Sequence, residues 1–321
     1  MSTVGSAGYV PGTLRGSERG VLIVGHGLIG GAVRAMLTAQ RVPVASVGRR
    51  PAGLPGYHGL DLASEAGRDG LRLVLDGLRP RCVLLVHGPS NVTWIESNEP
   101  AATAVHRGTA EIAVRSGAPV ILVSTDNVFP GTRSRYRIND PVVPANGYGR
   151  VKSLAERALL GHGRPGAPHM ILRVSLVYGW AGSGLRETFA QCCLEAAAEG
   201  RPMSVPVDQS FTPVHVRDVA AVLAAMCQHP ESHGINHLAG PVELSRYEFA
   251  RLAYELAGAD TSLVRPCSRQ DTEWACRPRF SSLASGSFAG LPGGRPMTPA
   301  EGLREMLSAR PAVPSLHGRD A

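Results

Sequence analysis

Apolar residues follow two alternating patterns along the chain. Short apolar runs predict buried strands that span 21–24, 43–47, 82–87, 119–123 and 169–174, with a further strand ending near residue 62. Between several of these runs, apolar residues return at helical spacing and predict helices over about 28–40, 99–116 and 148–160. Strands that alternate with helices in this way indicate an α/β fold built on a doubly wound parallel sheet.

The alternation becomes less regular after residue 175. The pattern there predicts helices over 187–199, 216–227, 245–257 and 299–308, with short strands at 204–207 and 235–238. We therefore expect a smaller C-terminal α/β part, from which segments can return to the main sheet.

Composition narrows the class of protein. Of the 321 residues, 43% are hydrophobic and 18% are charged, and the formal net charge is +7. These values are typical of a soluble globular chain. The basic balance suits phosphorylated small molecules, whereas no dense run of basic residues with interleaved aromatics predicts nucleic-acid binding. No apolar run is long enough to span a membrane.

The cysteines and the chain ends add little chemistry. The six cysteines form no C-x-x-C pair, which favours reduced thiols in a cytoplasmic protein over a disulfide framework or a metal site. Residues 1–19 are rich in Gly, Ser and Thr and have no apolar core, so we predict a flexible tail rather than a signal peptide. Residues 311–321 are predicted to form a second tail.

The first predicted strand runs into a glycine-rich turn that reads G-H-G-L-I-G from Gly25 to Gly30. Gly25 allows a tight turn, Gly27 lets the backbone approach a pyrophosphate, and Gly30 lets the following helix pack closely on the strand. The free N–H groups of that helix start, at Leu28 and Ile29, suit an anion. Strand, G-x-G-x-x-G and helix together predict a Rossmann-type dinucleotide site at these five positions.

The ends of the second and third strands indicate which dinucleotide binds. Arg49 and Arg50 follow the second strand, where a free ribose 2′-hydroxyl would call for an acidic residue. An arginine pair instead suits a 2′-phosphate, so we expect NADP(H) rather than NAD. Asp61 is placed to meet the adenine amino group, and the adjacent Leu62 is expected at the cofactor as well. We thus predict an NADP-binding Rossmann domain over 20–175 and a mainly substrate-binding part over 176–310.

Tyr148 and Lys152 are the strongest candidates for chemistry. Lys152 is the only lysine in the chain, and the two residues are four apart, which is one turn of a helix. A positive charge at that distance would stabilise a phenolate and lower the tyrosine pKa from about 10, giving a proton donor near neutral pH. The spacing alone also fits a surface helix with a chance pair.

Several motifs, in chain order, resemble the extended short-chain dehydrogenases/reductases. Within them the chain resembles the dTDP-4-dehydrorhamnose reductases and related nucleotide-sugar 4-ketoreductases over about residues 20–310. The resemblance is carried by G-H-G-L-I-G at Gly25, S-T-D-N-V-F-P-G at Ser124, Y-G-R-V-K at Tyr148, R-V-S-L-V-Y-G at Arg173, F-T-P-V-H-V-R-D-V-A at Phe211, H-L-A-G at His237, L-S-R-Y-E-F-A at Leu244 and R-P-R-F-S-S-L at Arg277. The most specific of these is the segment at Ser124.

The resemblance assigns roles to individual residues. Thr125 would hydrogen-bond the substrate carbonyl, Tyr148 would donate the proton, and Lys152 would bind the nicotinamide ribose and tune Tyr148. Further cofactor contacts are implied at His87, Gly88 and Val174. The implied substrate contacts are Ser124, Thr125, Asn127, Tyr148, Ser175, Trp180, Gln209 and Arg277. Relatives often dimerise through helices near Tyr148, so a homodimer is one expectation.

Two departures from the family pattern bear on the substrate. Val105 stands where the family usually has an asparagine, three residues before Gly108-Thr109. The fourth strand ends in His87-Gly88-Pro89-Ser90 rather than Asn-Ala-Ala. The second segment would lie beside the substrate, which leaves a nonstandard substrate open.

The expected function is NADPH-dependent reduction of a keto group on a nucleotide-diphosphate 4-keto-6-deoxyhexose, in bacterial deoxysugar or secondary-metabolite (antibiotic) biosynthesis. Three alternatives stay open: a reductase of a free keto-sugar or cyclitol intermediate, an epimerase or dehydratase of the same superfamily, and a noncatalytic NADP-binding regulatory subunit. Epimerases and dehydratases recycle NAD, so the arginines after the second strand argue against them. In each enzymatic case the partner is a small keto-sugar, with no nucleic acid and no membrane.

Overall fold

The computed structural model describes residues 19–49, 53–162, 168–230, 234–286, 288 and 290–310. The predicted C-terminal tail, all but residue 19 of the predicted N-terminal tail, and Arg50 lie outside these ranges. Within the described ranges, no helix is both long and apolar enough to cross a lipid bilayer.

A parallel sheet of seven strands forms the centre of the protein, with the strand order β11-β6-β5-β4-β1-β2-β3. Its members are β1 (Val21–Val24), β2 (Val44–Gly48), β3 (Tyr57–Gly59), β4 (Cys82–Leu85), β5 (Val120–Thr125), β6 (Met170–Val174) and β11 (Gly234–Leu238). From β1 the chain builds outward through β2 and β3 on one side, and through β4, β5 and β6 on the other. The chain thus reverses its direction of travel across the sheet between β1 and β4. In open α/β sheets, ligands bind at this switch point, beyond the carboxyl ends of the strands.

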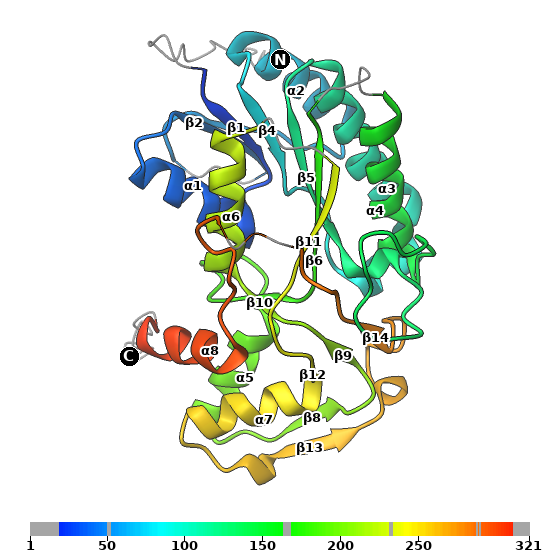
Figure 1. The fold of residues 1–321 in the computed structure, drawn as a ribbon, viewed down its shortest axis with the longest axis vertical. Coiled ribbons are helices and arrows are strands. Elements are labelled where there is room, and N and C mark those ends of the chain that lie inside the picture. Colours follow the sequence, from blue (N-terminus) through cyan, green and yellow to red (C-terminus); the bar gives the residue numbers. More distant parts are fainter. Residues whose placement is uncertain are drawn as a thin grey trace, which may run out of the picture.

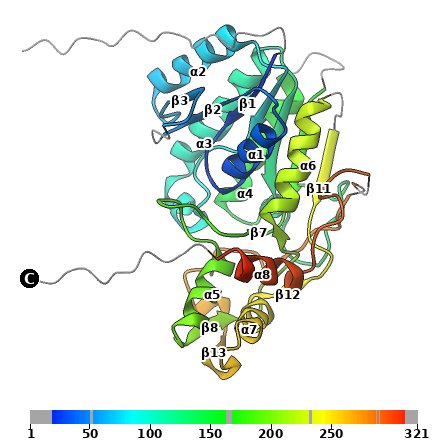
Figure 2. The same cartoon turned by 90° about the vertical axis from the view of Figure 1, so that its left-hand side faces the viewer.

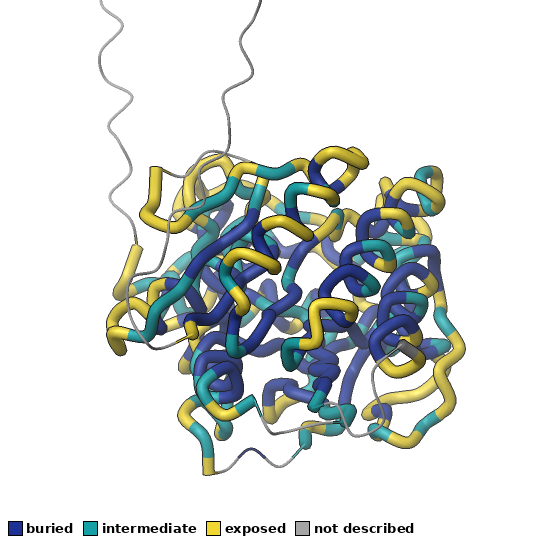
Figure 3. The backbone as a smooth tube through the Cα atoms, turned by 90° about the horizontal axis from the view of Figure 1, so that it is seen from above, coloured by how far each residue is buried: buried dark blue, intermediate teal, exposed yellow. Residues whose placement is uncertain are grey.

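Helices cover both faces of the sheet, as Figures 1 and 2 show. One face carries α1 (Leu28–Ala39) and α6 (Val216–Gln228); the other carries α2 (Glu65–Leu78), α3 (Val92–Arg115) and α4 (Gly147–His162). Alternate strand residues feed the two cores: Val21 and Ile23 pack under α1 and α6, whereas Leu22 and Val24 pack under the other layer. Figure 3 shows these buried segments inside a largely exposed rim. The predicted doubly wound α/β fold is confirmed.

A smaller lobe lies beyond the carboxyl ends of β5 and β6 (Figure 1). It contains α5 (Phe189–Ala198), α7 (Arg246–Leu256) and α8 (Pro299–Ser308), and a parallel pair formed by β8 (Met203–Pro206) and β13 (Val264–Cys267). Short two-residue strands join it to the sheet domain: β7 (Val177–Tyr178), β9 (Ser210–Phe211), β10 (Val214–His215), β12 (Leu244–Ser245) and β14 (Phe280–Ser281). Strand β11 belongs to the main sheet and α6 packs on it, so the lobe is not a continuous stretch of the chain.

Two helices differ from the sequence prediction. The segment that forms α2 was not predicted as a helix, although the Ser64 side chain caps it by accepting from the Gly67 N–H. Helix α3 begins at Val92 rather than near residue 99. It continues through Pro100 because Asn98 leaves helical geometry (φ −134°, ψ 29°), and this kink accommodates the proline.

Candidate active site

The glycine loop between β1 and α1 has the geometry of a phosphate cradle. Gly25 has φ +109°, and a Cβ there would lie 2.6 Å from the Val86 carbonyl oxygen. A Cβ on Gly30 would lie 1.9 Å from the Gly25 carbonyl oxygen, so both glycines are required by packing. A Cβ on Gly27 would meet nothing within 4 Å, and no side chain caps α1. The first N–H groups of α1, at Leu28 and Ile29, are thus left without a side-chain cap, and the loop fits a pyrophosphate.

The end of β2 is polar and partly exposed, but it does not by itself identify the cofactor. Arg49 is exposed there, and the adjacent Arg50 lies outside the described residues. The His26 ring packs edge-on against Tyr57 at 5.5 Å, and their contact closes the side of the loop beside Gly48. Burial and the nearby Arg34 lower the His26 pKa, so the ring is neutral at pH 7. The 2′-phosphate contact of Arg49 stays a prediction.

Of three further positions predicted to contact the cofactor, one is exposed and two are buried. Asp61 is exposed and accepts the Ala63 N–H at 3.1 Å. Leu62 is 7% exposed, with its side chain in the core beside α2. Val174 is likewise 7% exposed and packs in the core beside α1 and α6. A contact from Leu62 or Val174 to a cofactor would have to come from backbone atoms.

A buried histidine pair lies where β4 ends. His87 is 6% exposed, and its ring is 5.3 Å from that of His106 on α3. A Cβ on Gly88, which has φ +91°, would lie 2.4 Å from the His106 ring, so the glycine makes room for this histidine. Burial and the charge of Lys152 lower the pKa of both rings, that of His87 to about 3. Sequence reasoning missed His106; the only signal was its place beside Val105.

Tyr148 and Lys152 lie on the first two turns of α4, as predicted, but their electrostatics differ from the prediction. Lys152 is 3% exposed and donates from Nζ to the Val123 carbonyl at 2.6 Å. Burial lowers its pKa to about 8. Burial and the nearby Asp126 raise the Tyr148 pKa. The predicted lowering of the tyrosine pKa is therefore wrong, because burial and the charge of Asp126 act in the opposite direction.

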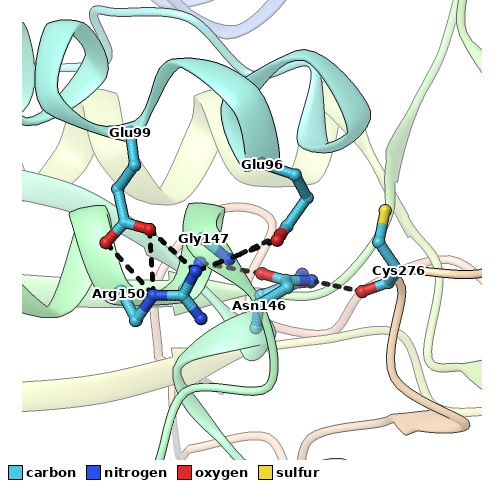
Figure 4. Close-up of polar contacts among 8 residues, drawn as sticks. Glu96, Glu99, Asn146, Gly147, Arg150 and Cys276 are labelled. Atoms are coloured by element: carbon cyan, nitrogen blue, oxygen red, sulfur yellow. Dashed lines mark hydrogen bonds and ion pairs between the residues drawn. The ribbon is translucent and has the colours of Figure 1, made fainter.

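Polar contacts fix the start of α4, and so the position of Tyr148 (Figure 4). Asn146 accepts the Gly149 N–H at 2.9 Å and donates to the Cys276 carbonyl at 3.2 Å. The Gly147 N–H donates to Glu96 at 2.6 Å. Arg150 forms a two-pronged pair with Glu99 on α3, with the shorter contact at 2.7 Å. Helix α3 and the segment around Cys276 thus hold the first turn of α4.

Thr125, Asp126 and Asn127 form a compact hydrogen-bonded group at the end of β5. Thr125 Oγ1 donates to Asp126 Oδ1 at 2.9 Å and accepts from Asn127 Nδ2 at 3.1 Å. Asn127 also donates to Asp126 at 2.7 Å and accepts from Asn146 at 2.8 Å. Ser175 donates to Asp126 Oδ2 at 3.0 Å. The structure thus brings three predicted substrate contacts together around Asp126, which sequence reasoning did not single out.

Ser124, the neighbour of Thr125, belongs to a different network. Its hydroxyl donates to Glu156 on α4 at 2.5 Å, and Glu156 pairs with Arg173 at 3.0 and 2.7 Å. The side chains of all three are 5% exposed or less. The proton of the Ser124 hydroxyl is therefore held by a buried carboxylate, and the contact of Ser124 with substrate stays a prediction.

The lobe contributes arginines that face the same region. Arg246 is 3% exposed, donates to Gln209 at 2.6 Å and lies over the rings of Phe189, Phe211 and Trp274. Arg277 is half-buried, and its buried Nε has no partner among the described residues. Burial lowers the pKa of Arg246 to about 9 and also lowers that of Arg277. Such a site favours an anion.

Two predicted substrate residues have structural partners in the lobe. Gln209 is 3% exposed and is engaged by Arg246. Trp180 donates from its indole N–H to the Met306 carbonyl at 2.7 Å, which ties it to α8. Their roles at the substrate stay predictions.

Comparison with known proteins identifies relatives over most of the chain. The family model described as "RmlD substrate binding domain" matches residues 19–310. A dTDP-4-dehydrorhamnose reductase of Mycobacterium tuberculosis is 31% identical over 300 residues, covering 86% of this chain and 94% of that protein. A dTDP-4-keto-6-deoxy-D-glucose reductase of Streptomyces niveus is 30% identical, covering 86% of this chain and 92% of that protein.

A solved structure shows the same fold. The dTDP-4-dehydrorhamnose reductase of Bacillus anthracis, crystallised with NADP, superposes with a TM-score of 0.77 and 22% identity. The match covers 91% of this chain and 99% of that one. The resemblance predicted from the sequence motifs is confirmed.

Proposed function

Because the chain belongs to the RmlD substrate-binding domain family, we propose that it uses NADPH to reduce a keto group on a nucleotide-linked sugar. It is an oxidoreductase of the extended short-chain dehydrogenase/reductase type, and NADP(H) is its cofactor. The proposed substrate is a nucleotide-diphosphate 4-keto-6-deoxyhexose, since two relatives are named as reductases of dTDP-linked keto sugars. A role in bacterial deoxysugar or secondary-metabolite biosynthesis follows from that substrate.

One observation carries the proposal. Thr125, a hydroxyl, ends β5, and Lys152, an amine, donates to the Val123 carbonyl of that strand. Tyr148, a phenol, lies one helical turn before Lys152. The open phosphate cradle at Gly27 follows β1, a parallel strand of the same sheet, so it lies at the same carboxyl edge. Thr125 bonds Asp126, and the charge of Asp126 acts on Tyr148, so the two hydroxyls share one neighbour. A regulatory subunit would not need this set.

The residues of this chain would act in a simple order. Thr125 and Tyr148 hold the carbonyl oxygen of the ketone from two sides. NADPH, when bound, supplies the hydride. The Tyr148 O–H transfers its proton to the oxygen on which negative charge develops. The raised pKa of Tyr148 makes the phenol a weak acid but returns it readily to the protonated state. Lys152, anchored on the Val123 carbonyl, would hold the nicotinamide ribose.

The arginines of the lobe support a nucleotide-diphosphate rather than a free sugar. Neither Arg246 nor Arg277 forms an ion pair with a carboxylate in the described part of the chain, although Arg246 is buried and Arg277 is half-buried with a buried Nε. A buried, unpaired guanidinium is costly and calls for an anionic ligand. Guanidinium forks match phosphate oxygens well. Trp274, over which Arg246 lies, is half-buried and offers an apolar face beside this charge.

The alternatives make different predictions. An epimerase or dehydratase would return its cofactor to the starting oxidation state, so NADPH would not be consumed in stoichiometric amounts. A noncatalytic subunit would bind NADP and reduce nothing. A cyclitol or free keto-sugar reductase would consume NADPH without needing the diphosphate.

The experiment is NADPH oxidation against a matched panel of dTDP- and UDP-linked 4-keto-6-deoxyhexoses, the corresponding free keto sugars, and keto-cyclitols. We expect turnover only with a nucleotide-linked ketone, with one NADPH consumed for each product formed. Turnover with free sugars alone would replace the substrate assignment. Tight NADP binding with no turnover on any member would favour the noncatalytic reading.

A further inference from the structure

Asp126 acts on both hydroxyls that are proposed to hold the ketone, through a hydrogen bond from Thr125 and through its charge on Tyr148. It is the first residue of a short 3-10 helix, Asp126–Val128, and connects the end of β5 to the segment before α4. Only 6% of the residue is exposed. Oδ1 accepts from Thr125 and Asn127 at 2.9 and 2.7 Å, and Oδ2 accepts from Ser175 at 3.0 Å.

These bonds leave Thr125 without a free proton. A hydroxyl has one proton and two lone pairs. The proton of Thr125 is directed to Asp126, and its lone pairs accept the Asn127 backbone N–H at 3.2 Å and the Asn127 side-chain amide at 3.1 Å. Thr125 can donate to a ketone only after it gives up the bond to Asp126.

The carboxylate also acts on the other hydroxyl. Its charge raises the pKa of Tyr148 on α4, and so opposes the phenolate that forms when Tyr148 gives up its proton. From the lobe side, the guanidinium groups of Arg246 on α7 and Arg277 feel the same charge. An ionised Asp126 therefore works against both donors of the proposed reduction, while the arginines favour its ionised form.

We propose that Asp126 is a positioning residue that decides whether the Thr125 hydroxyl is available to the ketone. This inference rests on the proposed reduction. When Asp126 is ionised, the 2.9 Å contact runs from Thr125 to Asp126. When Asp126 takes up a proton from solvent, its new O–H donates to Thr125 Oγ1 across the same contact, and one of the longer bonds from Asn127 gives way. The Thr125 proton then turns to the ketone oxygen.

The step balances as a proton transfer with no redox change. One O–H bond forms on Asp126 at the expense of one proton from water, and the Thr125 O–H bond is kept. The resulting chain runs from Asp126 to Thr125 to the ketone, and hydrogen bonds in such a chain strengthen one another.

The ionisation of Asp126 falls in a range that experiments can reach. Burial raises its pKa to about 6, against the hydrogen bonds from Thr125, Ser175 and Asn127, which act to lower it. The protonated form is the active one, so reduction should be fastest below this pKa and should decline as the pH rises through it. We expect kcat/KM to fall about a hundredfold between about pH 5 and about pH 8, as the protonated fraction of Asp126 does.

The test compares three variants with the wild type in the same assay. Asp126→Asn keeps the shape but cannot ionise, so its kcat/KM should be independent of pH in this range. Asp218→Asn is the matched control. Asp218, in the first turn of α6, is also largely buried with a raised pKa, but it accepts the Met297 N–H at 2.9 Å and, within the described residues, forms no hydrogen bond with Thr125 or Asp126. Its profile should match the wild type.

Thr125→Val keeps the test decisive if Asp126→Asn does not fold. Without a hydroxyl to reorient, the amplitude of the pH dependence should shrink to the part that acts through Tyr148. An unchanged midpoint and amplitude in Asp126→Asn, or in Thr125→Val, would overturn the inference. If the wild type reduces a ketone but a variant keeps the midpoint and amplitude unchanged, the role of Asp126 is wrong while the proposed function stands. If the wild type reduces no ketone, the proposed function itself is wrong.

Discussion

Ser124 and Thr125 are neighbours at the end of β5, yet they belong to two buried hydrogen-bond networks that differ in how their charges are paired. On the Ser124 side, Glu156 neutralises Arg173 through two contacts, and the Arg173 guanidinium also lies 5.1 Å over the Phe129 ring. On the Thr125 side, Asp126 is bound by hydroxyls and an amide, whereas no carboxylate in the described chain pairs with the neighbouring Arg246 or Arg277.

The difference separates a network that holds the fold from one that awaits a ligand. The Ser124 network has paired its charges inside the protein. The Thr125 network carries a carboxylate with its pKa raised to about 6 and an arginine with its pKa lowered to about 9. Perturbed pKa values of this kind cluster at functional sites. We therefore expect mutations on the two sides to differ in kind, one set affecting stability and the other turnover.

The largest effect is expected from Glu156→Gln. This change leaves Arg173 buried and unpaired, which should cost about 3–5 kcal/mol of unfolding free energy. Urea unfolding followed by circular dichroism measures it. Turnover per folded molecule should be close to that of the wild type. A stable Glu156→Gln protein with impaired turnover would mean that this network belongs to the active site.

Tyr148→Phe should lower turnover and leave the stability of the fold nearly unchanged. It removes the proposed proton donor and should lower kcat by about a hundredfold or more, while the half-buried ring keeps its packing. Steady-state kinetics on a nucleotide-linked ketone provides the measurement, with the melting temperature as the check on folding. Full activity in this variant would contradict the assignment of Tyr148.

Arg277→Gln should raise KM for a nucleotide-diphosphate sugar about tenfold, because one charged hydrogen bond to phosphate is lost. The free keto sugar, if it is turned over at all, should show no change. Arg279→Gln is the matched control, since Arg279 is exposed and lies over Phe280 at 5.2 Å. Equal effects of the two variants would show that Arg277 acts only through general positive charge.

The smallest effect is expected at the exposed ion pair between Arg150, at the start of α4, and Glu99 on α3. Glu99→Gln breaks a pair in which the Arg150 side chain is 47% exposed, so the loss of stability should stay below about 1 kcal/mol. Urea unfolding beside Glu156→Gln compares an exposed with a buried ion pair on the same helix. A loss as large as that of Glu156→Gln would remove the distinction between the two.

The sheet could be predicted because its strands are short apolar runs buried on both faces. The bounds of β1 agree with the prediction, and those of β2, β4, β5, β6 and β11 differ by one or two residues, whereas β3 ends at Gly59, three residues before its predicted end. Helix α2 was missed for a tertiary reason. Its glycines lower the local helix propensity, but a Cβ on Gly67 would lie 1.9 Å from the Asp61 carbonyl oxygen, and one on Gly70 would lie 2.7 Å from Leu60.

The site was predicted by residue type better than by environment. Thr125, Tyr148 and Lys152 could be named from spacing and motif, and the structure gathers them at one edge of the sheet. The raised pKa of Tyr148 and the separate network of Ser124 could not be predicted, because each depends on burial and on partners far along the chain. Asp126 was overlooked for the same reason, since its importance appears only when its three donors are in place.

The central claim is that this chain transfers hydride from NADPH to a nucleotide-linked ketone with Tyr148 as proton donor. The most direct measurement is a single turnover with NADPH deuterated at the transferable position, followed by mass spectrometry of the sugar product. The account predicts that deuterium appears at the new carbinol carbon with the wild type, and that its incorporation slows about a hundredfold in Tyr148→Phe. A product without deuterium, or equal rates in the two proteins, would contradict it.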